Sequence, residues 1–167
     1  MPAMIVADTM DQNASLKTVP AGAGDLFAVA GACLTWKARG EDTDGRFCFF
    51  EQTLEPGEGV PLHTHSYAEA FYVLEGSVEF ESDGAGEPIR GRRGDTVVAG
   101  PGIRHAFYNR GAETVRLLSI SAGEHQRFFD AVAEADRQTS FATMERPDAM
   151  RRIAEIGAAT DTVFLQN

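Results

Sequence analysis

The chain has little positive charge. Its 15 lysine and arginine residues stand against 25 aspartate and glutamate residues, which gives a formal net charge of −10. Nucleic-acid binding normally needs a basic face, so this composition argues against a DNA or RNA partner. The one basic cluster, Arg90, Arg92 and Arg93, is flanked by glycines and predicts a solvated loop. A contact with an anionic substrate remains the alternative for this cluster.

Long hydrophobic segments and cysteines are also scarce. No apolar run approaches the roughly 20 residues of a membrane-spanning helix. The start of the chain, MPAMIVADTMDQN, carries two aspartates and no basic residue, unlike a secretory signal. The two cysteines, Cys33 and Cys48, each lie in an apolar context typical of a strand. We therefore expect a cytoplasmic protein without a membrane partner, with both cysteines as reduced core residues.

Short apolar runs, separated by breaks rich in glycine, proline and aspartate, make up the middle of the chain. Runs of this length and spacing predict an all-β sandwich or barrel. They cover residues 27–38, 46–54, 69–82, 95–99, 105–109 and 114–122.

The pattern becomes helical after Ala122. Residues 123–138 place Phe128, Phe129 and Val132 on one helical face. Residues 146–157 predict a second short helix, with Pro147 in its first turn and Gly157 at its end; its apolar stripe is Met150, Ile153 and Ile156. We expect one domain in three parts: an N-terminal arm over residues 1–26, a β-barrel over 27–122 and a helical extension over 123–167 that packs on the barrel.

Three of the four histidines and one glutamate form a candidate metal site. Residues two apart on a strand face the same side, so His63 and His65 are expected to project together. Glu69 is expected to open the next strand and to return to the same pocket. His105 follows the tight Gly-Pro-Gly turn at residues 100–102 and opens another strand.

Three imidazoles and one carboxylate suit one divalent transition metal, and these donors admit Fe, Ni, Mn, Co, Cu or Zn. The simpler alternative is that these are ordinary polar residues at strand ends. His125, at the start of the first predicted helix, has no partner at ligand spacing and is not expected to bind the metal.

Apolar residues share the strand faces of the expected ligands. Phe71 and Val73 have the parity of Glu69, and Phe107 has the parity of His105. We expect these three side chains to line a substrate pocket.

The spacing of these residues resembles the two motifs of the cupin family. The first motif fits throughout, at Gly57, His63, His65, Glu69 and Gly76. The second fits at Gly94, Gly102, His105 and Asn109, although its proline is displaced to position 101. The resemblance covers about residues 53–121 and implies a double-stranded β-helix (jelly-roll) barrel with a metal inside, bound by His63, His65, Glu69 and His105.

Cupins have many activities, so the fold alone does not choose one. The first hypothesis is a dioxygenase for a small, largely apolar or aromatic substrate, with Glu69 as metal ligand and proton acceptor. The run from Gly123 to Phe129 is loosely similar to bacterial quercetin-dioxygenase-like cupins; helix packing is the alternative role for its phenylalanines.

Two other classes of function remain open. One is a non-redox lyase, isomerase or cyclase, in which Tyr67, Tyr72 or Tyr108 supplies a proton. The other is a non-catalytic protein that binds a small molecule.

A homodimer is expected, because a small open barrel leaves edge strands that must be covered. The segment from Phe27 to Lys37 is the candidate contact.

Overall fold

The structure, a computed structural model, describes residues 16–83 and 86–165. Most of the expected N-terminal arm, residues 1–15, therefore lies outside the described residues. The strands are β1 (Leu26–Val29), β2 (Ala32–Ala38), β3 (Cys48–Leu54), β4 (Gly59–Thr64), β5 (Glu69–Glu75), β6 (Ser77–Ser82), β7 (Ile89–Arg92), β8 (Thr96–Ala99), β9 (His105–Tyr108), β10 (Val115–Ser121) and β11 (Val163–Phe164). The helices are α1 (His125–Gln138) and α2 (Arg146–Ala159), with short 3₁₀ helices at Gly40–Asp42 and Phe141–Thr143.

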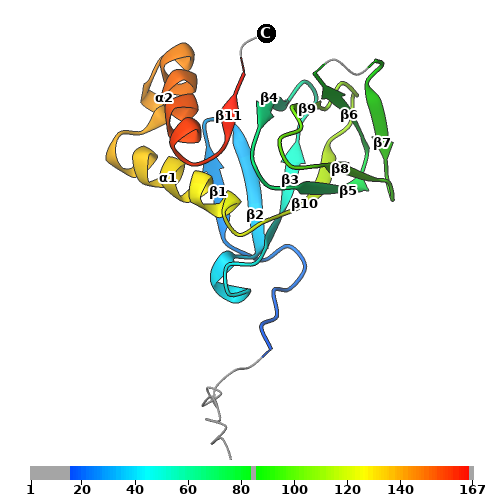
Figure 1. Ribbon diagram of the computed structural model, residues 1–167, viewed down its shortest axis with the longest axis horizontal. Helices are drawn as coiled ribbons and strands as arrows, with labels where there is room; N and C mark the ends of the chain where they lie inside the picture. Colours follow the sequence, from blue (N-terminus) through cyan, green and yellow to red (C-terminus); the bar gives the residue numbers. More distant parts are fainter. Residues whose placement is uncertain (1–15, 84–85, 166–167) are drawn as a thin grey trace, which may run out of the picture.

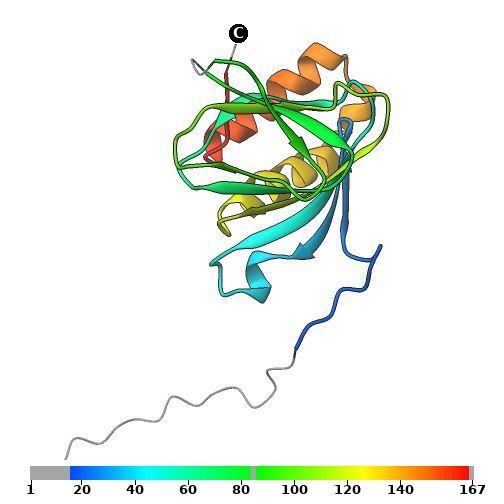
Figure 2. The ribbon, with the colours of Figure 1, turned by 90° about the vertical axis from the view of Figure 1, so that its right-hand side faces the viewer.

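The strands form two antiparallel sheets that face each other. One sheet has the order β1-β2-β3-β10-β5-β8 and the other has the order β11-β4-β9-β6-β7. Within the described residues no strand pairing joins the sheets, so they form an open sandwich rather than a closed barrel. Figure 2 looks at this sandwich with the strands in front and the helices behind them. The expected all-β jelly roll with two C-terminal helices is confirmed.

The core is divided into two clusters that lie on either side of the metal-ligand candidates. In the first, aromatic residues of β1 to β3 pack against the two helices, which lie beside β1, β2 and β11 in Figure 1. In the second, side chains from both sheets interdigitate; its buried members are Leu54, Phe71, Val73, Val78, Phe80, Phe107, Val115 and Leu117. The strict alternation of buried positions along β3 shows how period-two patterning directs one face inward.

Three local predictions need correction. Arg90 and Arg92 lie on strand β7 rather than in a loop, although both are exposed. Residues 27–38 form two strands, because Ala30 and Gly31 turn the chain with positive φ. Cys33 is exposed, whereas Cys48 is a buried free thiol as expected. On β2 the inward positions belong to Leu34 and Trp36, so Cys33 faces outward.

Helix α1 carries its predicted apolar face, but the predicted face of α2 needs correction. Met150 is exposed, because α2 turns Ala149, Ile153 and Gly157 inward instead. Phe128 and Val132 are buried against the β-sheets, and Pro147 lies in the first turn of α2. Gly157, however, does not end α2, which continues to Ala159. A Cβ atom at Gly157 would lie 2.2 Å from the carbonyl oxygen of Thr162 and 3.2 Å from the ring of Phe164. The glycine therefore allows the chain to turn back closely and enter β11.

Gly157→Ala is expected to lower the free energy of unfolding by about 1–3 kcal/mol, because the methyl group meets backbone rather than a movable side chain. β11 pairs with residues 63 and 64 of β4, so the same substitution disturbs the sheet beside His63. Urea unfolding followed by circular dichroism measures the change. Gly100→Ala is the matched control, since its Cβ would have only an ordinary 3.7 Å contact with Ile103. Equal midpoints for the two variants would contradict this account.

The expectations about a membrane and about a homodimer concern the helices and the edge of one sheet. No helix among the described residues is long and apolar enough to cross a membrane. Among residues 16–83 and 86–165, β1 is an edge strand of its sheet, so the segment from Phe27 to Lys37 includes a strand edge that none of these residues pairs with. Homodimer formation through that segment stays a prediction.

Candidate metal centre

The strand arrangement brings the four expected ligands together from three strands. His63 lies near the end of β4 and His65 directly after it, Glu69 opens β5, and His105 opens β9. His63 pairs with His105 across β4 and β9. One donor atom from each of the four residues lies within 4.8 Å of the others, and all four side chains are buried.

Backbone carbonyls orient each imidazole. The Nδ1 atoms of His63, His65 and His105 lie 2.9, 2.7 and 3.0 Å from the carbonyl oxygens of residues 61, 67 and 103. A carbonyl oxygen only accepts, so each Nδ1 donates a proton and each Nε2 faces the centre of the cluster. Metal-binding histidines use this same arrangement.

The donor set fits a metal ion. The Nε2 atom of His105 is buried and has no hydrogen-bond partner among the described residues, and a buried polar atom without a partner is costly. It lies 3.5 Å from Glu69 Oε2, and His65 Nε2 lies 3.1 Å from the same oxygen. A divalent cation held by His63, His65, Glu69 and His105 would satisfy these converging atoms.

The protonation states also suit metal binding. Burial, followed by the charge of His105, lowers the pKa of His63 to about 4, so His63 is a neutral imidazole near neutral pH. Burial alone would raise the pKa of Glu69, but the neighbouring imidazoles of His125, His105 and His65 lower this pKa well below its usual value. Glu69 is therefore a carboxylate. Burial opposes protonation of His65, yet its hydrogen bond with Glu69 raises the pKa of His65, so metal binding would release a proton there.

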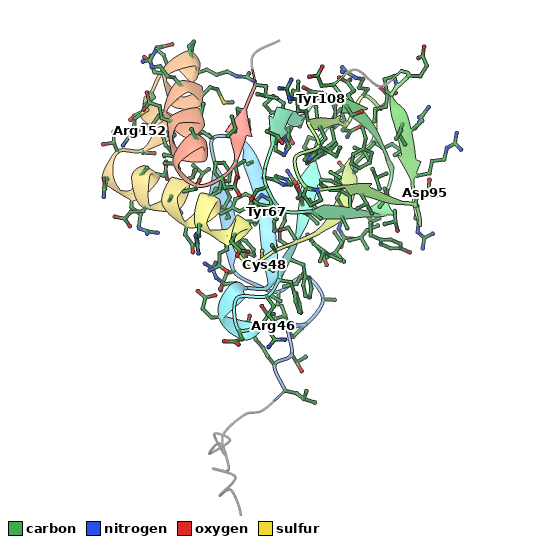
Figure 3. The ribbon with its side chains drawn as sticks, in the orientation of Figure 1. Arg46, Cys48, Tyr67, Asp95, Tyr108 and Arg152 are labelled. Atoms are coloured by element: carbon green, nitrogen blue, oxygen red, sulfur yellow. The ribbon has the colours of Figure 1, made fainter. Side chains whose placement is uncertain are left out.

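A second set of side chains lies against the ligands, and the sequence did not reveal it. Ser119 of β10 donates a hydrogen bond to Glu69 Oε1. His125 lies beside the cluster but outside the four-residue group, with Nδ1 2.8 Å from Ser121 Oγ and 3.8 Å from Glu69 Oε1. Tyr67, labelled near the centre of Figure 3, stacks on His65 with ring centroids 4.2 Å apart. The contacts of Ser119 and His125 with Glu69 join residues that are far apart in the sequence, which explains why no local spacing predicted them.

The motif glycine before His105 has a clear structural role. Gly102 has a φ of +74° and donates its backbone N–H to the carbonyl oxygen of His65, at 2.8 Å. The turn that leads into His105 is thereby tied to the segment carrying His65. Because the glycine makes this contact, the displaced proline at position 101 leaves the ligand set intact.

A cavity of about 850 Å³ opens from the metal-ligand candidates into the space between the sheets and the helices. His63, Glu69 and His125 lie at its inner end. Its walls are mainly aromatic and aliphatic; they include Phe27, Leu34, Phe50, Leu54, Val60, Phe107, Phe128, Phe129, Val132, Phe141 and Ile153. Phe128 and Phe129 thus both pack the helix and line the cavity.

The expected substrate-pocket residues divide into two groups. All three belong to the second core cluster, but only Phe107 also lines the cavity, whereas Phe71 and Val73 do not. Both side chains point inward from β5, as their alternation with Glu69 predicts, but the facing sheet covers them. A substrate contact by Phe71 or Val73 therefore has no support from this geometry.

The three tyrosines have different environments. Tyr108 lines the cavity, while Tyr72 lies on the outer face of its sheet. Tyr67 is buried outside the cavity lining, and burial raises the pKa of its phenol. Figure 3 shows Tyr108 near strands β4 and β9. Of the three, only Tyr108 is placed to meet a ligand in the cavity.

Residues 50–121 match the family model described as "Cupin domain". They contain all four metal-ligand candidates.

Two curated proteins resemble parts of the chain. One, from Pseudomonas aeruginosa and provisionally named quercetin 2,3-dioxygenase PA1210, is 32% identical over 126 residues, 66% of this chain and 54% of that protein. The other, from Streptomyces cyaneus and named polyketide synthase CurC, is 38% identical over 66 residues, 39% of this chain and 42% of that protein. The chain thus spans about half the length of these relatives.

Among solved structures, the polyketide cyclase RemF from Streptomyces resistomycificus superposes with a TM-score of 0.59. The match is 23% identical and covers 65% of this chain and 80% of RemF. At this identity the likeness shows a shared fold.

Proposed function

The chain belongs to the cupin superfamily, and from this premise we propose that it is a metal-dependent dioxygenase for a small, largely apolar, aromatic substrate. One observation carries the proposal: a buried set of three histidines and one glutamate adjoins a mainly apolar cavity, which two of its members, His63 and Glu69, line. The bound metal would supply oxygen activation or Lewis acidity there.

The cavity walls favour an aromatic ligand. Aromatic side chains from β1, β3 and α1 surround the space, and they interact edge to face, as in Phe27–Phe129 and Phe50–Phe129, with centroids 5.3 and 5.2 Å apart. A flat apolar ligand between such walls is removed from water, which stabilises the complex. The same walls limit the access of water to the inner end.

Glu69 is the proposed proton acceptor. Ser119 and His65 hold its two carboxylate oxygens from different sides, so the group is oriented before a ligand enters. Because the carboxylate is ionised and lines the cavity, it can accept a proton from a hydroxyl group of the ligand.

The provisional name of the Pseudomonas aeruginosa relative supports an oxygen-dependent reaction. The name of the Streptomyces cyaneus relative, polyketide synthase, favours a second candidate, a non-redox reaction on a polyketide, with the metal as a Lewis acid. A binding protein without turnover is the third.

Oxygen uptake distinguishes these candidates. We expect protein loaded separately with Fe, Mn, Ni, Co, Cu or Zn to consume oxygen only when a redox-active metal and an aromatic substrate such as quercetin are both present. An oxygen electrode and chromatography of the products measure uptake and conversion. Conversion at an equal rate under strict anaerobiosis would establish the non-redox candidate instead, and tight binding without conversion would establish the binding protein. Metal-free protein is the control.

A further inference from the structure

A single glutamine interrupts the apolar inner face of β3. The buried positions of this strand are Cys48, Phe50, Gln52 and Leu54. Gln52 is only 6% exposed, and across β3 its register partners are the buried Leu34 and Leu117. An amide at such a position is unusual, because burial of a polar group without a partner is unfavourable.

The Gln52 amide faces the cavity without a protein partner. It lines the cavity and makes no side-chain hydrogen bond with any residue of 16–83 or 86–165. Its polar atoms are not among those completely enclosed by protein, so they are reached from the cavity. The amide is therefore free to bind a ligand there.

Gln126 provides a comparison. It is also 6% exposed, but its amide oxygen accepts a hydrogen bond from the backbone of Gly40, and its amide nitrogen donates to Glu41 and Asp130. Gln126 thus follows the rule that buried polar groups are paired, and Gln52 departs from it.

Gln52 lies well away from the metal centre along the sheet. Ser121 of β10 pairs with both Cys48 and Glu69, and Ser119, which donates to the Glu69 carboxylate, pairs with Phe50, so the metal centre lies at the level of Cys48 to Phe50 on β3. Gln52 is two to four residues further along this strand, roughly 7–13 Å, and β3 lies two strands away from β5, roughly 10 Å across the sheet. Phe50 and Leu54 flank it on the same face.

We propose that Gln52 is a specificity-determining residue, which binds an oxygen substituent at the end of the substrate distant from the metal. This inference rests on the proposed function, since it assigns the substrate class of the same cavity. The distance between Gln52 and the metal centre requires a substrate longer than one substituted benzene ring, with two or more linked or fused rings. The amide both donates and accepts, so it suits a neutral hydroxyl or carbonyl group.

The charges of the cavity agree with a neutral substituent. Apart from the metal-ligand candidates, two charged residues line the cavity, Glu58 and Arg146, and both are exposed. The buried residues that line the cavity next to Gln52 on β3 are uncharged. An ionised group at Gln52 would lose its hydration without gaining a counter-ion, which is strongly unfavourable.

The first test uses no ligand. Gln52→Leu replaces the amide with a slightly shorter apolar side chain and is expected to leave the melting temperature unchanged or raise it, because no protein hydrogen bond is lost. Gln126→Leu, the matched control, is expected to lower the melting temperature by roughly 2–4 °C or more. A fall for Gln52→Leu as large as that of the control would overturn the proposal, because it would show that the amide has a structural partner.

The second test measures recognition by the zinc-loaded protein, so it does not depend on turnover. Kaempferol and galangin are flavonols that differ by one hydroxyl group on the terminal ring, and isothermal titration calorimetry compares their affinities. We expect the natural protein to prefer kaempferol by roughly tenfold, the value of one hydrogen bond. Gln52→Leu should remove this preference while it retains the affinity for galangin.

A preference that persists in Gln52→Leu would overturn the assignment, and so would the absence of binding by both flavonols. Loss of the preference would support the role of Gln52 even if the protein loaded with redox-active metals consumed no oxygen, and this lack of uptake would contradict only the dioxygenase. The two proposals can therefore fail separately.

Discussion

His63→Ala is expected to lower metal affinity by more than about 100-fold, since even residues that only support metal ligands contribute 10–100-fold. The substitution removes one of four converging donor atoms and leaves His105 facing an incomplete site. Elemental analysis after purification in the presence of a chelator measures the loss. Thermal unfolding of the metal-free proteins shows whether the variant still folds.

His125→Ala is the matched control for this experiment. His125 is a buried histidine next to Glu69, and burial lowers its pKa to about 4, so the variant removes a similar neutral side chain from the same region. Its metal content should equal that of the natural protein. A loss as large as that of His63→Ala would place His125 in the coordination sphere and contradict the four-residue assignment.

Glu69→Gln is expected to reduce turnover by about 10²–10⁴-fold, the usual contribution of a positioned acid or base. The amide nearly preserves the size of the side chain and can still accept the hydrogen bond from Ser119, but it has lost the negative charge. Steady-state oxygen uptake and metal content, measured on the same preparation, separate the two roles of Glu69. Retained metal with lost turnover would assign Glu69 a chemical role.

Glu51→Gln is the control for the charge change. Glu51 is half-buried on β3 but pairs with Arg116 away from the cavity, so its turnover should stay near that of the natural protein. If Glu69→Gln keeps both metal and turnover, Glu69 serves only packing and the proposed mechanism is wrong.

The metal-ligand candidates are the part of this protein that local sequence described best. His63 and His65 share a face because strand side chains alternate, and Glu69 and His105 each open the strand that follows a turn. These relations depend on a few neighbouring residues and on turn chemistry. The all-β fold and the two amphipathic helices were predictable for the same reason, since each element carries its own periodicity.

Other features depend on which elements meet in space. The alternation of side chains along a strand correctly predicts that Phe71 and Val73 point inward. Only the facing sheet determines that they are enclosed and that Phe107 borders the cavity. Gly157 has the sequence context of a helix end, yet the close return of the chain at Thr162 requires it inside α2. Cys33 is exposed because its neighbours on β2 take the inward positions.

The sequence by itself determined the strand pattern and the two helices, because these follow from short-range periodicity, and the motif spacing marked the four candidate donors. Only the tertiary structure decided that His125 and Ser119 lie against Glu69, and that Gln52 faces the cavity without a protein partner. The physical reason is that hydrogen bonding and enclosure are properties of side chains that approach from distant parts of the chain. A glutamine in a strand reads the same in sequence whether it is paired, solvated or directed at a ligand.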